Sequence, residues 1–185
     1  MKSKTINSRS KLIGWTEMRL FDKDGNAKPM FKENFLWRLF KKYFNLDFQI
    51  PFLFGNWTTS AIKRNTITSI GKKISADQAG GTTTSPVTAI ALGVGTPSAS
   101  ALGSESTTNG GSRGAATVSN QTTTTTGDTE RWVKTFTFTG ALALIEEGLF
   151  DNNTTGGLML ASQTFSAVNV VDSDTLQITH NVKYA

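Results

Sequence analysis

The stretch Arg131-Trp132-Val133-Lys134-Thr135-Phe136-Thr137-Phe138-Thr139 decides the fold class of this chain. Trp132, Phe136 and Phe138 fall on one face of an extended segment, together with a lysine. Threonines and a valine fall on the other face. A repeat of two residues is typical of a β-strand with one buried face. The stretch therefore predicts a half-buried strand.

Segments of similar character follow this strand. They cover residues 141–145, 158–165, 168–171 and 175–184, and turn-forming residues separate them at 151–157 and 172–174. Short strands spaced by turns, without helices between them, favour an antiparallel sandwich or barrel over a parallel sheet. We expect a mostly β protein whose body, residues 61–185, is a β-sandwich or barrel-like domain.

The part of the body that precedes residue 131 is less regular. Residues 58–74 fit a strand or a short helix, and their β-branched side chains favour a strand before Gly71. Residues 80–127 are rich in Thr, Ser, Gly and Ala and predict exposed loops, extended against a neighbouring chain or ordered only after assembly. One strand, residues 87–92, is expected within them.

Residues 1–60 have a different composition, and we interpret them as an N-terminal arm. Residues 15–57 hold 12 of the 18 aromatic residues of the chain. Residues 15–21 predict a strand, and residues 22–26 predict a tight turn after it. Apolar residues at three- and four-residue spacing over 31–44 predict an amphipathic helix, followed by an extended segment around Pro51.

An arm with so many aromatic rings and little core of its own is expected to bury them against neighbouring subunits. The expected subunit-interface residues are Phe31, Phe35, Trp37, Leu39, Phe40, Tyr43, Phe44, Phe52, Phe54 and Trp57. Lipid and nucleic acid are the alternative partners of the basic aromatic helix, because lysines and an arginine lie beside its aromatic residues.

Charge is unevenly distributed along the chain, which has 185 residues, a net charge of +5 and no cysteine. Residues 1–75 carry 15 of the 19 basic residues and 5 of the 14 acidic residues. This pattern is typical of a basic arm beside an acidic body. Without cysteine there are no disulfides or thiolate chemistry. Because the first 15 residues lack an apolar segment, we expect a protein made in the cytoplasm.

Catalytic groups are sparse in the sequence. His180 is the single histidine, and it shares a strand face with Leu176, Ile178 and Val182, so we interpret it as a strand residue at the edge of the core or at an interface. The adjacent Glu146 and Glu147 would point to opposite faces of a strand; we expect them at a turn, accepting backbone hydrogen bonds. We predict no enzymatic activity, no metal and no cofactor.

Several motifs in the C-terminal two-thirds of the chain resemble those of small virion proteins of tailed bacteriophages. The matching stretches are Ile90-Ala91-Leu92-Gly93-Val94-Gly95-Thr96, Glu146-Glu147-Gly148-Leu149-Phe150, Gly156-Gly157-Leu158-Met159-Leu160-Ala161 with Phe165, Ser173-Asp174-Thr175-Leu176-Gln177-Ile178-Thr179 and, upstream, residues 65–73. The resemblance implies a place in the tail, neck or capsid surface of a virion, and it brings no catalytic residues.

We therefore expect a structural protein of a bacteriophage virion that assembles through its arm with copies of itself, as a homo-oligomer, and with other virion proteins. The alternative is a receptor- or carbohydrate-binding module of a phage fibre or capsid decoration. In that alternative the loops near Asn109 or Asn152 bind the sugar and Trp132 supplies an aromatic platform.

Overall fold

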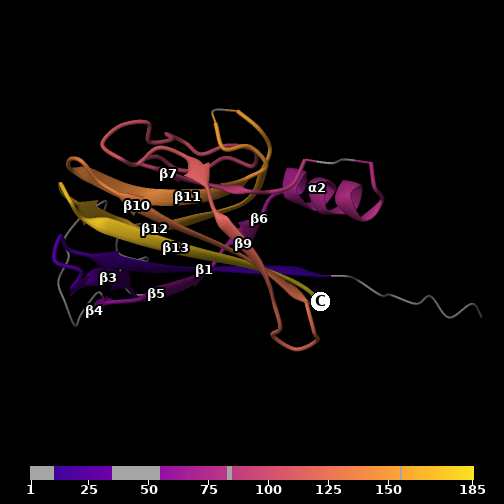
Figure 1. Ribbon diagram of the computed structural model, residues 1–185, viewed down its shortest axis with the longest axis horizontal. Coiled ribbons are helices and arrows are strands. Elements are labelled where there is room, and N and C mark those ends of the chain that lie inside the picture. Colours follow the sequence, from indigo (N-terminus) through magenta and orange to yellow (C-terminus); the bar gives the residue numbers. More distant parts are fainter. Residues whose placement is uncertain (1–10, 35–54, 83–84, 155) are drawn as a thin grey trace, which may run out of the picture.

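The computed structural model describes residues 11–34, 55–82, 85–154 and 156–185. These residues form two antiparallel sheets packed face to face, a two-stranded ribbon and one helix (Figure 1). The expected fold class, mostly β with a sandwich-like body, is confirmed.

The first sheet is built around a long pair of strands from the two ends of the chain. β1 and β13 pair in register from Leu12 opposite Tyr184 to Phe21 opposite Thr175. In spatial order the strands are β2 (Ala27–Lys28), β1 (Leu12–Phe21), β13 (Thr175–Tyr184), β10 (Thr129–Thr137) and β9 (Thr117–Gln121), and β5 (Ala61–Arg64) also pairs with β1.

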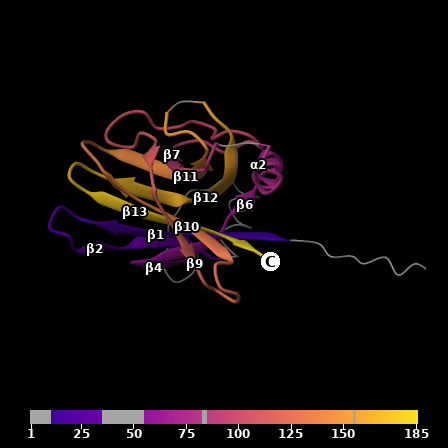
Figure 2. The ribbon, with the colours of Figure 1, turned by 45° about the vertical axis from the view of Figure 1, so that its right-hand side comes forward.

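The second sheet lies above the first in Figure 1, and a 45° rotation shows the same layering (Figure 2). Its strands, in spatial order, are β6 (Thr66–Ile67), β12 (Met159–Val170), β11 (Leu142–Phe150), β7 (Ala89–Gly93) and β8 (Gly114–Ala115). The expected segments 158–165 and 168–171 are one continuous strand, β12. The separate ribbon consists of β3 (Met30–Glu33) and β4 (Gly55–Thr58).

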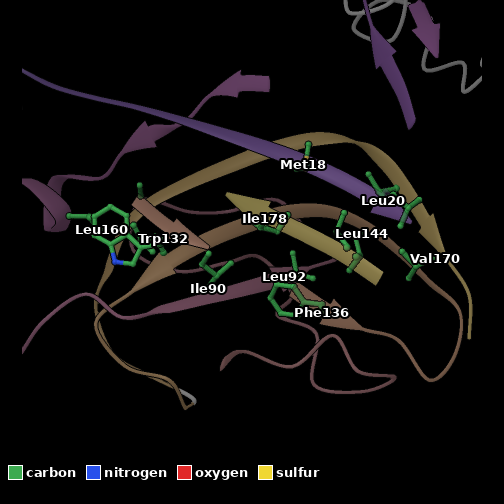
Figure 3. Close-up of a cluster of buried hydrophobic side chains, with 14 of the residues drawn as sticks. Met18, Leu20, Ile90, Leu92, Trp132, Phe136, Leu144, Leu160, Val170 and Ile178 are labelled. Carbon is green, nitrogen blue, oxygen red and sulfur yellow. The ribbon is translucent and has the colours of Figure 1, made fainter. Parts of the chain in front are cut away.

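The core fills the space between the two sheets (Figure 3). Alternate residues of β13 and β10 point into it, as the period of two predicts, and Leu176, Ile178 and Phe136 are almost completely buried. Ile90, Leu92 and Leu144 meet them from the second sheet. Burying one such side chain stabilises the fold by about 1.5–3 kcal/mol.

Residues 11–34, which were expected within an arm, supply β1 and β2 of the first sheet, β3 of the ribbon and part of the core. Met18 and Leu20 of β1 and Met30 of β3 are buried in the main cluster. These residues are therefore packed within the sandwich of their own chain.

The expected strand up to Ile70 is wrong in its last part, because helix α2 (Ser69–Ala79) begins there. The side chain of Thr68 caps the helix by accepting the N–H of Gly71 at 2.7 Å. A Cβ atom on Gly71 would lie 2.0 Å from the carbonyl oxygen of Leu160 in β12, so only glycine lets the helix pack this closely.

The Thr/Ser/Gly-rich region is more ordered than the expected exposed loops. The segment after β7 folds back over the outer face of the second sheet, where Leu102 packs on Phe150, Met159 and two alanines of β7. Further along, β9 pairs with β10 and forms a hairpin. The expected strand at 87–92 is confirmed as β7.

Candidate interaction surface

The ribbon β3–β4 presents an aromatic pair at the surface. Phe31 and Trp57 are cross-strand partners, with ring centroids 5.5 Å apart and an edge-to-face angle of 68°. Phe31 is 5% exposed and Trp57 is 51% exposed. Phe31 therefore anchors the ribbon, and Trp57 offers half its surface to solvent.

A pocket of about 250 Å³ lies beside this pair, between the ribbon, β1, β5 and β12. Its floor is apolar, with Met18 and Met30 among the lining side chains, while Ile62, which is 56% exposed, also lines it. The full lining is Met18, Met30, Phe31, Lys32, Glu33, Ala61, Ile62, Lys63, Arg64, Phe165, Ser166 and Val168.

We define the interaction surface as Trp57, Ile62 and this pocket. Aromatic and Arg side chains are enriched at protein interfaces, and a small apolar pocket can take one anchoring side chain of a partner. Three of the lining residues are basic and one is acidic. The lining of the pocket therefore suits an apolar side chain of a partner protein, flanked by acidic residues, better than it suits a small polar substrate.

Only two of the ten expected interface residues lie in the described part of the chain, Phe31 and Trp57. The structure brings these two into contact. The expected helix over 31–44 is wrong at its start, because residues 31–33 belong to strand β3 and pair with β4. The other eight lie outside the described residues: Phe35, Trp37, Leu39, Phe40, Tyr43, Phe44, Phe52 and Phe54.

A second notable group of polar residues is buried between the two sheets. His180 of β13 and Glu147 of β11 are both fully buried, and His180 Nδ1 lies 3.2 Å from Glu147 Oε2. The hydroxyl of Thr16 donates to Glu147 Oε1 at 2.8 Å and lies 3.3 Å from His180 Nδ1. We call these three residues and Asn65 the buried polar cluster.

Asn65 completes the cluster. Its amide oxygen accepts from His180 Nε2, and its amide nitrogen donates to the carbonyl oxygen of Gly14 at 3.1 Å. Both imidazole nitrogens thus have partners, and Trp132 lies edge-on to the ring at 6.4 Å between centroids. The expectation of a strand residue for His180 is consistent with this position, but it lies in the core rather than at the edge.

The cluster connects four segments of the chain, and its histidine is completely buried. Buried polar groups of this kind contribute to a fold only when each is paired, because an unpaired one costs about 1–3 kcal/mol. The geometry assigns it a structural role, in holding β1, β11, β13 and the segment before β6 in one arrangement.

Glu146 and Glu147 were expected at a turn, with backbone N–H groups as partners; the turn is wrong, and the backbone partners are confirmed for Glu146. Both lie within β11, where a β-bulge between Leu144 and Glu146 changes which residues face inward. Glu147 therefore enters the core and Glu146 points to the outer face. There Glu146 accepts three backbone N–H groups at 2.9–3.0 Å, those of Gly95, Gly103 and Ser104.

The sugar platform expected at Trp132 is also contradicted. Trp132 is 4% exposed, and its indole N–H donates to the carbonyl oxygen of Val87 at 2.8 Å. A ring in this position packs in the core and cannot stack on a carbohydrate. The side chain of Asn109 donates to the carbonyl oxygen of Ala141, and that of Asn152 accepts the N–H of Thr154 within its own loop.

No set of three or more His, Cys, Asp or Glu side chains in the described ranges is placed to hold a metal ion.

At the expected turn 22–26, Asp22 accepts the N–H groups of Asp24 and Asn26. These hydrogen bonds, the one from the Asn26 N–H above all, lower the pKa of Asp22 although burial opposes them. The described part of the chain also contains no helix with the length and hydropathy of a membrane span.

No family model, no curated protein and no solved structure matches this chain.

Proposed function

We propose that this chain is a structural subunit of a bacteriophage virion, and that it acts by binding rather than by catalysis. In this proposal it binds copies of itself and other virion proteins through the interaction surface of Trp57, Ile62 and the neighbouring pocket. The observation that carries it is the exposed Trp57 and Ile62 on a folded ribbon and edge strand, beside an apolar pocket.

The positions of the phage-like motifs support the proposal. Residues 90–96 end β7 and start the covering loop, residues 146–150 form the end of β11, and residues 173–179 form the turn into β13. The motifs are thus features of a sandwich framework. A framework of this kind, with its histidine and two glutamates buried, suits a mechanical role.

Charge gives the proposed partner a chemistry. The described residues carry 13 basic and 13 acidic side chains, so the net charge of +5 comes from residues 1–10 and 35–54. The lining of the pocket holds three basic residues and one acidic residue. We therefore expect the neighbouring surface to be acidic around an apolar contact.

The test is the mass of the purified chain in solution, measured by light scattering over a range of concentrations. The wild-type chain should form an oligomer, and the double variant Trp57→Ser/Ile62→Ser should form it at least about tenfold more weakly, since aromatic hot-spot residues carry 2 kcal/mol or more. The matched control is Leu158→Ser/Val171→Ser, which removes equally exposed apolar side chains from turns elsewhere.

The control variant should behave as the wild type. Deletion of residues 1–60 is unsuited to this test, because it removes β1 and the core residues Met18, Leu20 and Met30. A wild-type chain that stays monomeric at every concentration, and binds no virion protein, would contradict the proposal.

A further inference from the structure

Strand β9 ends the first sheet and leaves one edge open in the described part of the chain. It pairs with β10 from Thr117 opposite Val133 to Gln121 opposite Thr129. Three of its five residues are exposed, including Val118 at 43%. An open strand edge presents unpaired N–H and C=O groups that can pair with another strand.

The edge carries none of the features that usually prevent such pairing. β9 reads Thr-Val-Ser-Asn-Gln, with no charged residue and no proline, and its register with β10 has no bulge. Natural edge strands are commonly protected by lysines, prolines, bulges or a covering segment. An unprotected edge of this kind is therefore a surface suited to strand addition.

We propose that β9 pairs antiparallel with β9 of a second copy of this chain, on a two-fold axis at Ser119. This inference rests on the proposed function, and it names one partner and one contact for the assembly. The two first sheets then form one continuous sheet across the dimer.

The sequence of β9 is compatible with itself in this register. Ser119 faces Ser119 of the second copy, Thr117 faces Gln121, and Val118 faces Asn120, so no like charges and no large side chains oppose each other. Alternate residues of a strand direct their backbone groups to opposite edges. Because the axis passes through the central residue, the pairing works for either set of outward-pointing groups.

The hairpin that continues β9 is already ordered without a partner. The carboxylate of Asp128 accepts the backbone N–H groups of residues 123–125 at 2.9–3.0 Å, and Lys183 lies 3.4 Å from it. Residues 122–127 at the tip are exposed, and the hairpin projects away from the body in Figure 1. A pre-ordered projection loses little conformational entropy when it docks.

The antiparallel register also determines where this tip lies in the dimer. The tip follows Gln121, which faces Thr117 of the second copy, so the tip extends past Thr117 towards that copy's Ala116 and β8. Each copy thus contributes one strand edge and one hairpin. Five paired residues with a hairpin form a small interface, and we expect a dissociation constant on the order of 10 µM.

The test is a charge swap at the axis, read by sedimentation equilibrium of the full-length chain. Ser119→Asp places two carboxylates opposite each other and Ser119→Lys places two ammonium groups opposite each other. Each variant alone should dimerise about fivefold more weakly than the wild type or worse, because like charges directly opposed across strands repel. An equimolar mixture of the two variants should regain dimer, as Asp then faces Lys.

The matched control applies the same swap at Thr137, an exposed residue on the same face of the first sheet beyond the end of β9. Thr137→Asp and Thr137→Lys should dimerise as the wild type does, and circular dichroism should show the same fold for all variants. Recovery on mixing is specific to a residue that faces itself, so it would establish the axis.

Wild-type association that is unchanged in both Ser119 variants overturns this inference. If association is then lost in Trp57→Ser/Ile62→Ser, the proposed function stands and the dimer uses the other surface. A chain that is monomeric as the wild type at 100 µM, about ten times the expected dissociation constant, also overturns the β9 dimer. In that case binding to other virion proteins still tests the proposed function.

Discussion

Removal of the Glu147 carboxylate should be one of the most damaging single changes in the core. In Glu147→Ala, His180 Nδ1 and the Thr16 hydroxyl both lose a partner at a fully buried position, and a cavity is left between the sheets. Breaking a buried pair by removing one partner costs about 3–5 kcal/mol, a large part of the total stability of about 5–15 kcal/mol.

Glu147→Gln is the matched control for this change. Its amide oxygen can accept from Thr16, and its amide nitrogen can donate to Nδ1 of a neutral His180 whose Nε2 still donates to Asn65. Since every buried group keeps a partner, we expect a loss of about 1 kcal/mol or less. The difference in stability loss between the two variants therefore measures the lost hydrogen bonds together with the cavity, and the double-mutant cycle below isolates the pairing with His180.

The assay is urea unfolding followed by tryptophan fluorescence, with equal m-values as the condition for comparing free energies of unfolding. A double-mutant cycle between Glu147→Ala and His180→Ala should give a coupling free energy of about 1 kcal/mol or more. Equal stability losses for Glu147→Ala and Glu147→Gln, or a coupling below about 0.5 kcal/mol, would refute the reasoning about the buried polar cluster.

Three further changes test other parts of the structure. Gly14→Ala puts a Cβ 1.8 Å from the Asn65 amide and should lower the free energy of unfolding in urea by about 1–3 kcal/mol. Arg113→Lys loses the two hydrogen bonds to Glu105 at 2.9 and 2.5 Å and the stacking 3.6 Å above the Phe150 ring. We expect it to lower the free energy of unfolding by about 1–2 kcal/mol and to speed hydrogen exchange of the backbone amides in the loop after β11. Burial on its own raises the pKa of Asp128, but the threonine N–H groups outweigh it and hold this pKa well below the ordinary 3.8. On acidification the unfolded chain therefore takes up the proton first, so stability present at neutral pH is lost below about pH 4, and Asp128→Asn should show a smaller loss between pH 6 and pH 3. An equal pH dependence in wild type and Asp128→Asn would contradict this assignment.

The strands with a clear period of two were predictable from the sequence. In β10 and β13 the large apolar residues Trp132, Phe136, Leu176 and Ile178 share the face that points into the core, and the other face is largely polar. The face that His180 shares with Leu176 and Ile178 followed from the same alternation, but its complete burial did not. Its partners did not, since Thr16, Asn65 and Glu147 are brought to it by strand pairing between distant segments.

Each feature that the sequence did not predict has a physical explanation. Two adjacent glutamates suggest a surface turn, and only the N–H groups of a distant loop and the buried histidine make their burial in β11 favourable. Residues 58–74 were left open between a strand and a short helix because their β-branched residues favour strands; Thr68 at the N-cap of α2 was the available signal for the helix. The covering loop after β7 was missed because glycine and serine carry little hydrophobic pattern.

Concentration-dependent hydrogen–deuterium exchange of the full-length chain tests the central claim, assembly through exposed surfaces of a rigid sandwich, most directly. We expect slower exchange at high concentration in β3, β4 and β9, with the exchange rates of the core strand β13 unchanged. Identical exchange in all of these strands at every concentration would contradict it.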